Sequence, residues 1–267
     1  GRSRGPRCPR SAGPEPNGAR LSITNAAGES LSAVAGDSGF IVKALVSELK
    51  GSAVVITERL PDAEGIEKLI ENTDRIYLVA GQSDPVAVAK DPLPSLKVLL
   101  GKMRLVLMAK RDGKEPLIVN ASSIAVYHAG GVKGSSADED SVLPLFQKDT
   151  EADDWMSGAQ SKFEQYLNQN LDASLTQDKE FVRDFLDRNP IPNRMKADAY
   201  SLIHVLGERI VAKAPNGLSV RLGQVYGPGQ NRSMARIPML IRHFALGEAA
   251  TTKLRHNDPR QVTEIDD

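Results

Sequence analysis

The chain has 267 residues, 40% apolar and 25% charged, a composition typical of a globular protein rather than a disordered one. Its 34 Lys and Arg residues balance 34 Asp and Glu residues, so there is no net positive charge to hold a nucleic acid. No apolar run approaches the roughly 18 residues that cross a bilayer, and the single cysteine, Cys8, excludes an internal disulfide. We therefore expect a soluble protein with no transmembrane segment and no nucleic-acid partner.

The segment of residues 1–30 differs in composition from the rest of the chain, and we expect it to be extended. Its arginines outnumber its acids in the first twenty residues, where Glu15 is the only acid among Pro, Gly, Ser and Ala. A basic, acid-poor end is typical of a plastid or mitochondrial transit peptide, although Pro and Gly disfavour the usual amphipathic helix. A tag remnant or a disordered tail on a cytoplasmic protein is the alternative interpretation.

From residue 31 onward, short apolar runs alternate with segments of helical periodicity. This alternation is typical of βαβ units and predicts an α/β fold with a doubly wound parallel sheet and helices on both faces. The predicted strands are Leu31–Ala35, Val54–Ile56, Ile76–Ala80, Leu117–Ser122 and Leu218–Leu222. The predicted helices are Phe40–Lys50, Ala63–Asn72, Ser95–Lys110 and Ala197–Ala214.

The segment of residues 147–196 is rich in polar helix formers and interrupts this alternation. Apolar residues recur there at helical spacing in two runs, and Ser174 with Gln177 forms a candidate capping box before the second run. Asn189 and Pro190 would end the second helix. We predict a helical hairpin whose apolar stripe is buried against the main domain or against a partner.

The turn after the first predicted strand reads Gly36-Asp37-Ser38-Gly39-Phe40-Ile41. Glycine in such a turn lets backbone N–H groups approach a pyrophosphate at the positive end of the following helix. Two glycines in a turn are common, however, and Val42 stands where a third is expected. The turn alone therefore leaves a dinucleotide site and an ordinary strand–helix turn equally open.

Three further stretches join this turn in a family resemblance: residues 119–127, Ala199–His204 with Gly207 and Glu208, and Arg221–Gln230. Together they resemble the extended and atypical short-chain dehydrogenase/reductase superfamily, in particular its NAD-dependent nucleotide-sugar epimerases and dehydratases. The resemblance implies a Rossmann-like fold, NAD or NADP as cofactor and a nucleotide-sugar substrate. It divides the chain into the basic segment 1–30, a dinucleotide-binding half at 31–146, the helical insertion at 147–196, and the remaining core with the start of a truncated C-terminal substrate lobe at 197–267.

The resemblance assigns the chemistry to Ser123, Tyr200 and the position of His204. Ser123 would hold the substrate hydroxyl and Tyr200 would act as general base, which requires a nearby positive charge because a free phenol has a pKa near ~10. The family's lysine, four residues after the tyrosine, is replaced by His204. An imidazole of pKa about 6.5 is mostly neutral at pH 7. His204 is then either a pH-dependent relay or the mark of a vestigial site.

For the cofactor, the resemblance points to the glycine-containing turn and to strand ends. Glu58 follows the second strand, where an acid accepts the adenosine ribose hydroxyls and favours NAD over NADP, although a solvated strand end is equally consistent. The candidate cofactor-binding residues are Gly36, Ser38, Gly39, Phe40, Ile41, Glu58 and Ala80. The histidines show no metal-ligand spacing, so no metal site is predicted.

Three departures from the family pattern accompany His204. Leu99 stands where a proton-relaying asparagine is expected, and Val42 replaces the third glycine. Between Glu58 and Tyr77 there is room for one helix only, so the strand that completes the adenine pocket is expected to be short or absent. These departures favour a catalytically degenerate protein that serves as a structural or assembly subunit of an organellar complex.

Two alternatives remain open. One is an active NAD(P)-dependent epimerase, dehydratase or reductase that uses Ser123 and Tyr200 with His204 in place of lysine. The other is a redox-sensing or RNA-contacting Rossmann-type module; the neutral net charge and the 4% aromatic content argue against its RNA-contacting version.

The helix Ser95–Lys110 also bears on partners, because the resemblance implies dimerisation through this helix and Ala197–Ala214. Its cations would make that surface more polar than a homodimer interface prefers: Lys97, Lys102, Arg104 and Lys110. We therefore expect a hetero-assembly, with the insertion either covering this surface or providing a new one.

Overall fold

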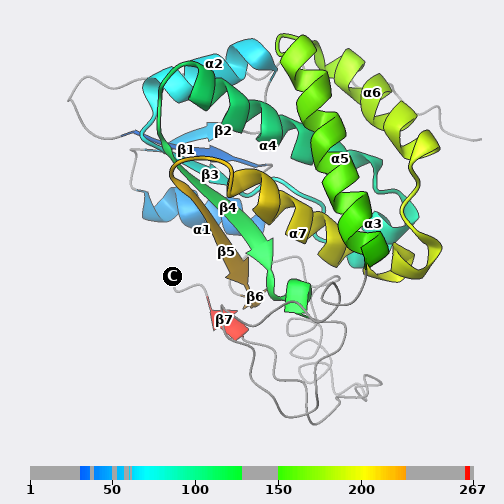
Figure 1. Cartoon of the computed structure of the whole chain (residues 1–267). Helices are drawn as coiled ribbons and strands as arrows, with labels where there is room; N and C mark the ends of the chain where they lie inside the picture. The colour runs from blue at the N-terminus through cyan, green and yellow to red at the C-terminus, as the bar shows by residue number, and fades with distance from the viewer. Residues whose placement is uncertain are drawn as a thin grey trace, which may run out of the picture.

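The computed structural model describes residues 31–36, 39–49, 53–56, 60, 62–127, 150–226 and 262–264, and structural statements refer to these residues. Five parallel strands form one sheet in the order β2-β1-β3-β4-β5 (Figure 1). They are β1 (Ser32–Ala35), β2 (Ala53–Ile56), β3 (Arg75–Leu78), β4 (Leu117–Ser123) and β5 (Gly217–Leu222). A separate parallel pair consists of β6 (Gln224–Tyr226) and β7 (Val262–Glu264).

Strand β1 has β2 as its neighbour on one side and β3 on the other. Ser32 is in register with Ala53 of β2 on one side and with Arg75 of β3 on the other. The strand order therefore reverses between β1 and β3, and in open α/β sheets ligands bind beyond the carboxyl ends of the strands at such a switch point. This edge of the sheet is where a site is expected.

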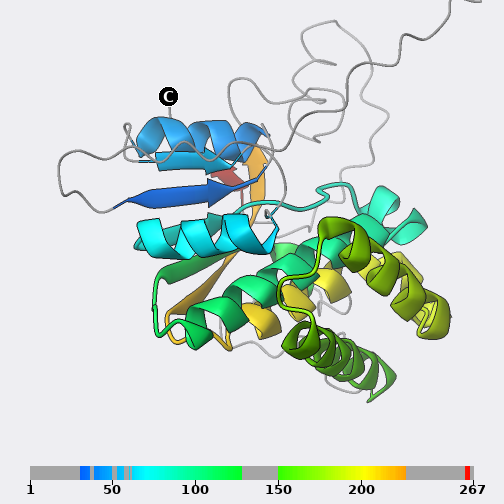
Figure 2. The same ribbon diagram turned by 90° about the horizontal axis from the view of Figure 1, so that it is seen from above.

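Helices cover both faces of the sheet. Helix α1 (Phe40–Glu48) lies on one face, and α2 (Ala63–Asn72), α4 (Leu93–Arg111) and α7 (Ala199–Val211) lie on the other (Figure 2). The short helix α3 (Pro85–Lys90) precedes α4 and packs against α7. The predicted doubly wound parallel sheet is confirmed, and each predicted strand and helix occurs with its ends moved by a few residues.

One difference from the prediction concerns helix α3, whereas the segment between β2 and β3 agrees with it. Helix α3 was not predicted, because six residues give too short a pattern; its start is marked by Asp84, which accepts the N–H of Val86, and by Pro85 in the first turn. In the described residues the sheet ends at β2, and α2 is the helix found between β2 and β3. The described part of the chain thus shows one helix and no further strand there, as the spacing predicted.

The insertion forms the predicted hairpin, made of α5 (Thr150–Gln169) and α6 (Leu175–Arg188). The capping box is present: Ser174 Oγ accepts the N–H of Gln177, and Gln177 Oε1 accepts the N–H of Ser174. The hairpin lies as an outer layer on α4 and α7 (Figure 2). The apolar stripe of the hairpin is buried there, so the main domain, rather than a partner, covers it. The stripe comprises Met156, Phe163, Leu167, Val182 and Phe185.

Helix α4 lies between the sheet and this hairpin, so 13 of its 19 residues are buried. A helix enclosed on several sides is expected to be apolar around most of its circumference. Two of its buried residues are charged, Lys102 and Arg104, which are 5% and 1% exposed. The prediction that these two cations form a polar outer surface is therefore wrong, because the hairpin and β4 cover them. No helix in the described ranges has the length and apolar character to cross a bilayer.

Candidate active site

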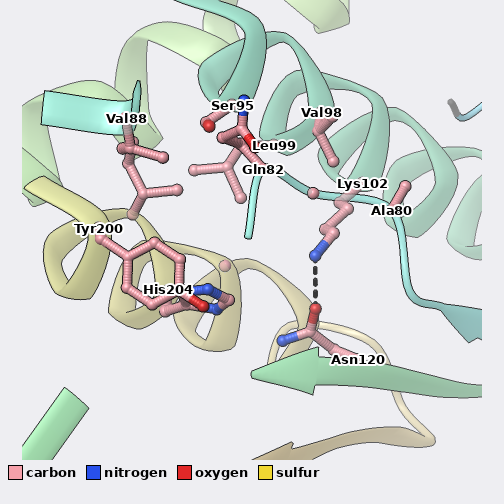
Figure 3. A pocket seen from close by; sticks show the side chains of 13 residues that line it. Ala80, Gln82, Val88, Ser95, Val98, Leu99, Lys102, Asn120, Tyr200 and His204 are labelled. Atoms are coloured by element: carbon pink, nitrogen blue, oxygen red, sulfur yellow. Dashed lines mark hydrogen bonds between the residues drawn. The ribbon is translucent and has the colours of Figure 1, made fainter. Parts of the chain in front are cut away.

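A small pocket lies at the carboxyl edge of the sheet, between the loop after β3 and helices α4 and α7 (Figure 3). Ala80 and Gln82 line it from the loop, Lys102 from α4, and Tyr200 and His204 from α7. Its volume is about 30 Å³, which is room for one or two water molecules. The described walls therefore fit the tip of a ligand rather than a whole nucleotide.

Ser123 and Tyr200 lie near each other at the end of β4, close enough for the serine hydroxyl to influence the pKa of the phenol. The strand and helix are held together there by Ala125, whose N–H donates to Ser123 Oγ at 3.1 Å and whose carbonyl accepts from Ser201 Oγ at 2.8 Å. Burial raises the pKa of Tyr200, and the Ser123 hydroxyl opposes this shift. The phenol is consequently protonated at neutral pH.

His204 lies one helical turn after Tyr200, and the two rings meet edge to face with centroids 4.5 Å apart. Burial lowers the pKa of His204 to about 3, and the charge of Lys102 acts in the same direction. The imidazole is therefore neutral at pH 7 and contributes no positive charge beside the phenol. Leu99, which lines the same pocket, is buried and offers no proton-transfer group.

Lys102 also lines this pocket, although the sequence predicts it on the polar outer surface of the helix Ser95–Lys110. Its Nζ donates to Asn120 Oδ1 of β4 at 2.6 Å, and Asn120 Nδ2 in turn donates to Ser219 Oγ of β5 at 3.1 Å. Burial lowers the pKa of Lys102 to about 8. A signal was present in the sequence, because Lys102 lies between Leu99 and Met103 on a helix that is otherwise largely apolar.

The turn between β1 and α1 brings Gly36 close to the loop after β3. A Cβ at Gly36 would lie 2.8 Å from Val42 Cγ2 and 3.4 Å from the backbone N of Ala80. Val42 thus occupies the space that Gly36 leaves open, and this explains how the turn accommodates a β-branched residue at the third-glycine position. Ser38 and Glu58 lie outside the described residues.

The start of α1 fits an anionic group. Gly39 is its N-cap and provides no side-chain cap, the first turn contains no acidic residue, and a Cβ at Gly39 would meet nothing within 4 Å. The unpaired N–H groups of a helix N-terminus, here those of the turn that begins with Phe40 and Ile41, bind phosphate groups well. These residues could hold the pyrophosphate of a dinucleotide whose ends extend along the carboxyl edge of the sheet.

A second polar cluster joins the other three stretches of the family resemblance. Arg221 of β5 donates to both carboxylate oxygens of Glu208, at 3.0 and 2.8 Å, and Ser122 Oγ donates to the same carboxylate at 2.5 Å. Arg221 also lies over the ring of Tyr127, 4.8 Å from its centroid, at the end of the 3-10 turn η1 (Ile124–Tyr127). Glu208 raises the pKa of Arg221 further. The cluster fixes α7 against the ends of β4 and β5.

This topology defines a Rossmann-type fold, with a pocket after β3, beside the switch point of the sheet. No family model matches the chain, and no curated protein matches it in sequence. Solved structures do share the fold, and nucleotide-sugar epimerases and dehydratases are among them, as the resemblance predicts.

Three of these structures span most of the chain. UDP-N-acetylglucosamine 4-epimerase from Methanobrevibacter ruminantium M1 has a TM-score of 0.52 at 17% identity, covering 89% of this chain and 69% of its own. UDP-glucose 4-epimerase from Thermotoga maritima has a TM-score of 0.52 at 15% identity, covering 88% and 69%. dTDP-glucose 4,6-dehydratase from Bacillus anthracis, in complex with NAD, has a TM-score of 0.54 at 12% identity, covering 89% and 68%. At these identities the likeness shows the fold alone.

Proposed function

We propose that the chain binds a nicotinamide dinucleotide, NAD rather than NADP, along the carboxyl edge of the sheet. The uncapped start of α1 beside Gly36 and Gly39 supports a pyrophosphate site. Glu58, which follows β2, would hold the adenosine ribose and give the preference for NAD. The nicotinamide end would then lie towards Ala80 and Tyr200, on the side of β1 opposite to β2 in the strand order. When bound, a nicotinamide ring accepts and returns a hydride.

We further propose that the protein is catalytically degenerate and that the bound dinucleotide has a structural role. One observation carries this proposal: the phenol of Tyr200 is half-buried with a raised pKa, and the ring packed against it is the neutral imidazole of His204. A general base must be deprotonated at the working pH, and a phenol in this setting is not. Ser123 and Tyr200 would keep their proximity as a structural feature of the fold.

The second candidate is an active epimerase, dehydratase or reductase of nucleotide sugars. The proximity of Ser123 and Tyr200 favours it, because a substrate hydroxyl would have to contact both side chains. In this case Tyr200 would take the proton from the sugar hydroxyl, Ser123 would orient that hydroxyl, and the hydride from the carbon that bears it would pass to the nicotinamide ring.

A single-turnover experiment separates these two candidates. The protein is loaded with NAD and mixed with UDP-glucose, UDP-N-acetylglucosamine or dTDP-glucose, and the absorbance of reduced nicotinamide is followed at pH 7 and pH 9.5. We expect no reduction at pH 7 with any of the three sugars. Reduction that disappears in Tyr200→Phe, a variant that keeps the ring and removes the hydroxyl, would establish the second candidate instead.

An assembly role in an organellar complex belongs to the same proposal. The arginine-rich segment of residues 1–30 supports the location, and the need to retain a fold without turnover supports the subunit role. Because the apolar stripe of α5 and α6 is buried on α4 and α7, the partner would contact the outer, polar side of the hairpin. Affinity purification of the tagged full chain, followed by identification of stoichiometric partners, tests this role; a chain recovered alone as a monomer contradicts it.

A further inference from the structure

Lys102 is buried in the candidate site without a counter-ion among the described residues. It is 5% exposed, and Asn120 Oδ1 is its hydrogen-bond partner in that part of the chain. An ammonium group carries three N–H donors. Two N–H donors of Lys102 therefore have no hydrogen-bond partner among the described residues, and a ligand could accept from them.

A buried ammonium without a carboxylate opposes folding, whereas an apolar side chain of similar length at the same place would favour it. Residues on either side of Lys102 along α4 are apolar, so a methionine or leucine would suit the packing here. Ionisable groups that are desolvated in a cleft are found mostly at functional sites. The position of Lys102 is accordingly better explained by a ligand than by stability.

The other ionisable groups that face this pocket are Tyr200 and His204, both on α7. Both are neutral at pH 7, while β4 contributes the amide of Asn120, and α3 and the loop after β3 contribute no ionisable side chain. On the outer side of α4, Arg104 pairs with Asp178 of α6, so that carboxylate is engaged elsewhere. Figure 3 shows Lys102 entering from α4 and the two α7 rings from the opposite side. Lys102 is thus the cation of the described pocket lining.

The pocket also lies at a defined end of the proposed dinucleotide site. The sheet order places β2, with Glu58 after it, on one side of β1, and β3 and β4, with the pocket, on the other. A dinucleotide whose pyrophosphate binds at α1 would therefore bring its nicotinamide-ribose half to the pocket. With room for one or two water molecules, the pocket admits a hydroxyl group but not a ring.

We propose that Lys102 binds a ribose hydroxyl oxygen of the nicotinamide half of the dinucleotide, from its position on α4 opposite Tyr200 and His204. This assignment rests on the proposed dinucleotide site. It makes Lys102 a binding residue for the cofactor, acting together with Asn120, which fixes the direction of the ammonium group.

The test measures NADH and ADP binding by calorimetry between pH 6.5 and pH 10. Lys102→Met is compared with the unchanged chain and with Lys110→Met, which removes the same charge from an exposed position of the same helix. We expect Lys102→Met to bind NADH about tenfold more weakly at pH 7, the size of a lost charged hydrogen bond. ADP has no nicotinamide half, so its affinity should be the same in all three proteins.

The pH profile adds a readout that packing alone would not change. The affinity of the unchanged chain and of Lys110→Met for NADH should fall above pH 8, where Lys102 loses its proton, and Lys102→Met should show no such fall. A flat NADH profile in the unchanged chain overturns the assignment of Lys102 and needs no variant. Equal NADH affinity in Lys102→Met and the unchanged chain also overturns it, while leaving the dinucleotide site in place. If the unchanged chain binds neither NADH nor ADP, both proposals fall.

Discussion

Arg104 of α4 and Asp178 of α6 form a bidentate ion pair in the interior of the protein, with Nη1–Oδ2 and Nη2–Oδ1 distances of 2.6 and 2.7 Å. Tyr166 of α5 donates to the same carboxylate at 3.2 Å. A single carboxylate thus joins three helices, and it fixes the position of the α5–α6 hairpin on the layer formed by α4 and α7.

Removing this carboxylate charge should release the hairpin. Asp178→Asn keeps the shape of the side chain but leaves the guanidinium of Arg104 buried without a counter-ion, which typically costs about 3–5 kcal/mol of the free energy of unfolding. Urea denaturation measures the loss, and hydrogen exchange should rise first in α5 and α6.

A matched control is available on the surface. Glu151 pairs with Arg194 at 2.5 Å, and both side chains are 55% exposed. Glu151→Gln should therefore change the free energy of unfolding by less than about 1 kcal/mol. Similar losses in the two variants would contradict a special role for the buried pair.

The sequence predicts the local elements of the fold but not the burial of the charged residues on α4. The capping box of Ser174 and Gln177 and the strand–helix alternation are local signals, and the elements they predict are present. Lys102 and Arg104 were interpreted as surface cations, because the groups that cover them come from β4 and α6, far along the chain. Their burial is a consequence of tertiary packing, which helical periodicity does not encode.

The candidate site likewise has features that the sequence predicts and features that depend on tertiary packing. The pairing of Ser123 with Tyr200 follows from the family resemblance, and the structure brings these side chains together. The neutral state of His204 follows from desolvation by α4 and from the charge of Lys102. Neither effect can be read from the spacing between Tyr200 and His204, which is all that the sequence offers.

Lys102→Met should stabilise the protein at neutral pH. The pKa of Lys102 is about 8, below its ordinary value of 10.5, so the folded state binds this proton less tightly than the unfolded state. The shift opposes folding by about 3 kcal/mol below pH 8, and this penalty vanishes as the pH rises to 10.5. Because the variant leaves Asn120 Oδ1 unpaired, at about 1 kcal/mol, we expect a gain of about 2 kcal/mol at pH 7.

Urea denaturation of both proteins at pH 7 and pH 10 measures this effect. The gain from Lys102→Met should shrink at the higher pH, since Lys102 is then neutral in the folded protein. A variant that is less stable than the unchanged chain at pH 7 would show instead that the ammonium group contributes to folding.

His204 should make the protein sensitive to mild acid. Its pKa is about 3 in the folded protein and about 6.5 when unfolded, so its contribution to stability is intact above pH 6.5 and is lost as the pH falls. At pH 5 the loss amounts to about 2 kcal/mol, and His204→Gln should lack this part of the acid dependence. Parallel stability curves for the two proteins between pH 7 and pH 5 would contradict the burial of a neutral imidazole.

Gly36→Ala should destabilise the turn between β1 and α1. The added Cβ would lie 2.8 Å from Val42 Cγ2, an overlap that typically costs about 1–3 kcal/mol. Val42→Ala in the same chain removes that methyl group, so the two losses should be less than additive in thermal denaturation. Gly158→Ala in α5 is the control, because a Cβ at this position would meet nothing within 4 Å and alanine is the better helix former.

The most direct measurement is a calorimetric titration of the purified protein, freed of co-purified nucleotide, with NAD⁺, NADH, NADP⁺ and NADPH at pH 7. We expect saturable binding of NAD⁺ and NADH and weaker binding of the two phosphorylated forms, because an acid at Glu58 repels a 2′-phosphate. Absence of binding for all four nucleotides would contradict the dinucleotide site at the start of α1, and with it the proposed function.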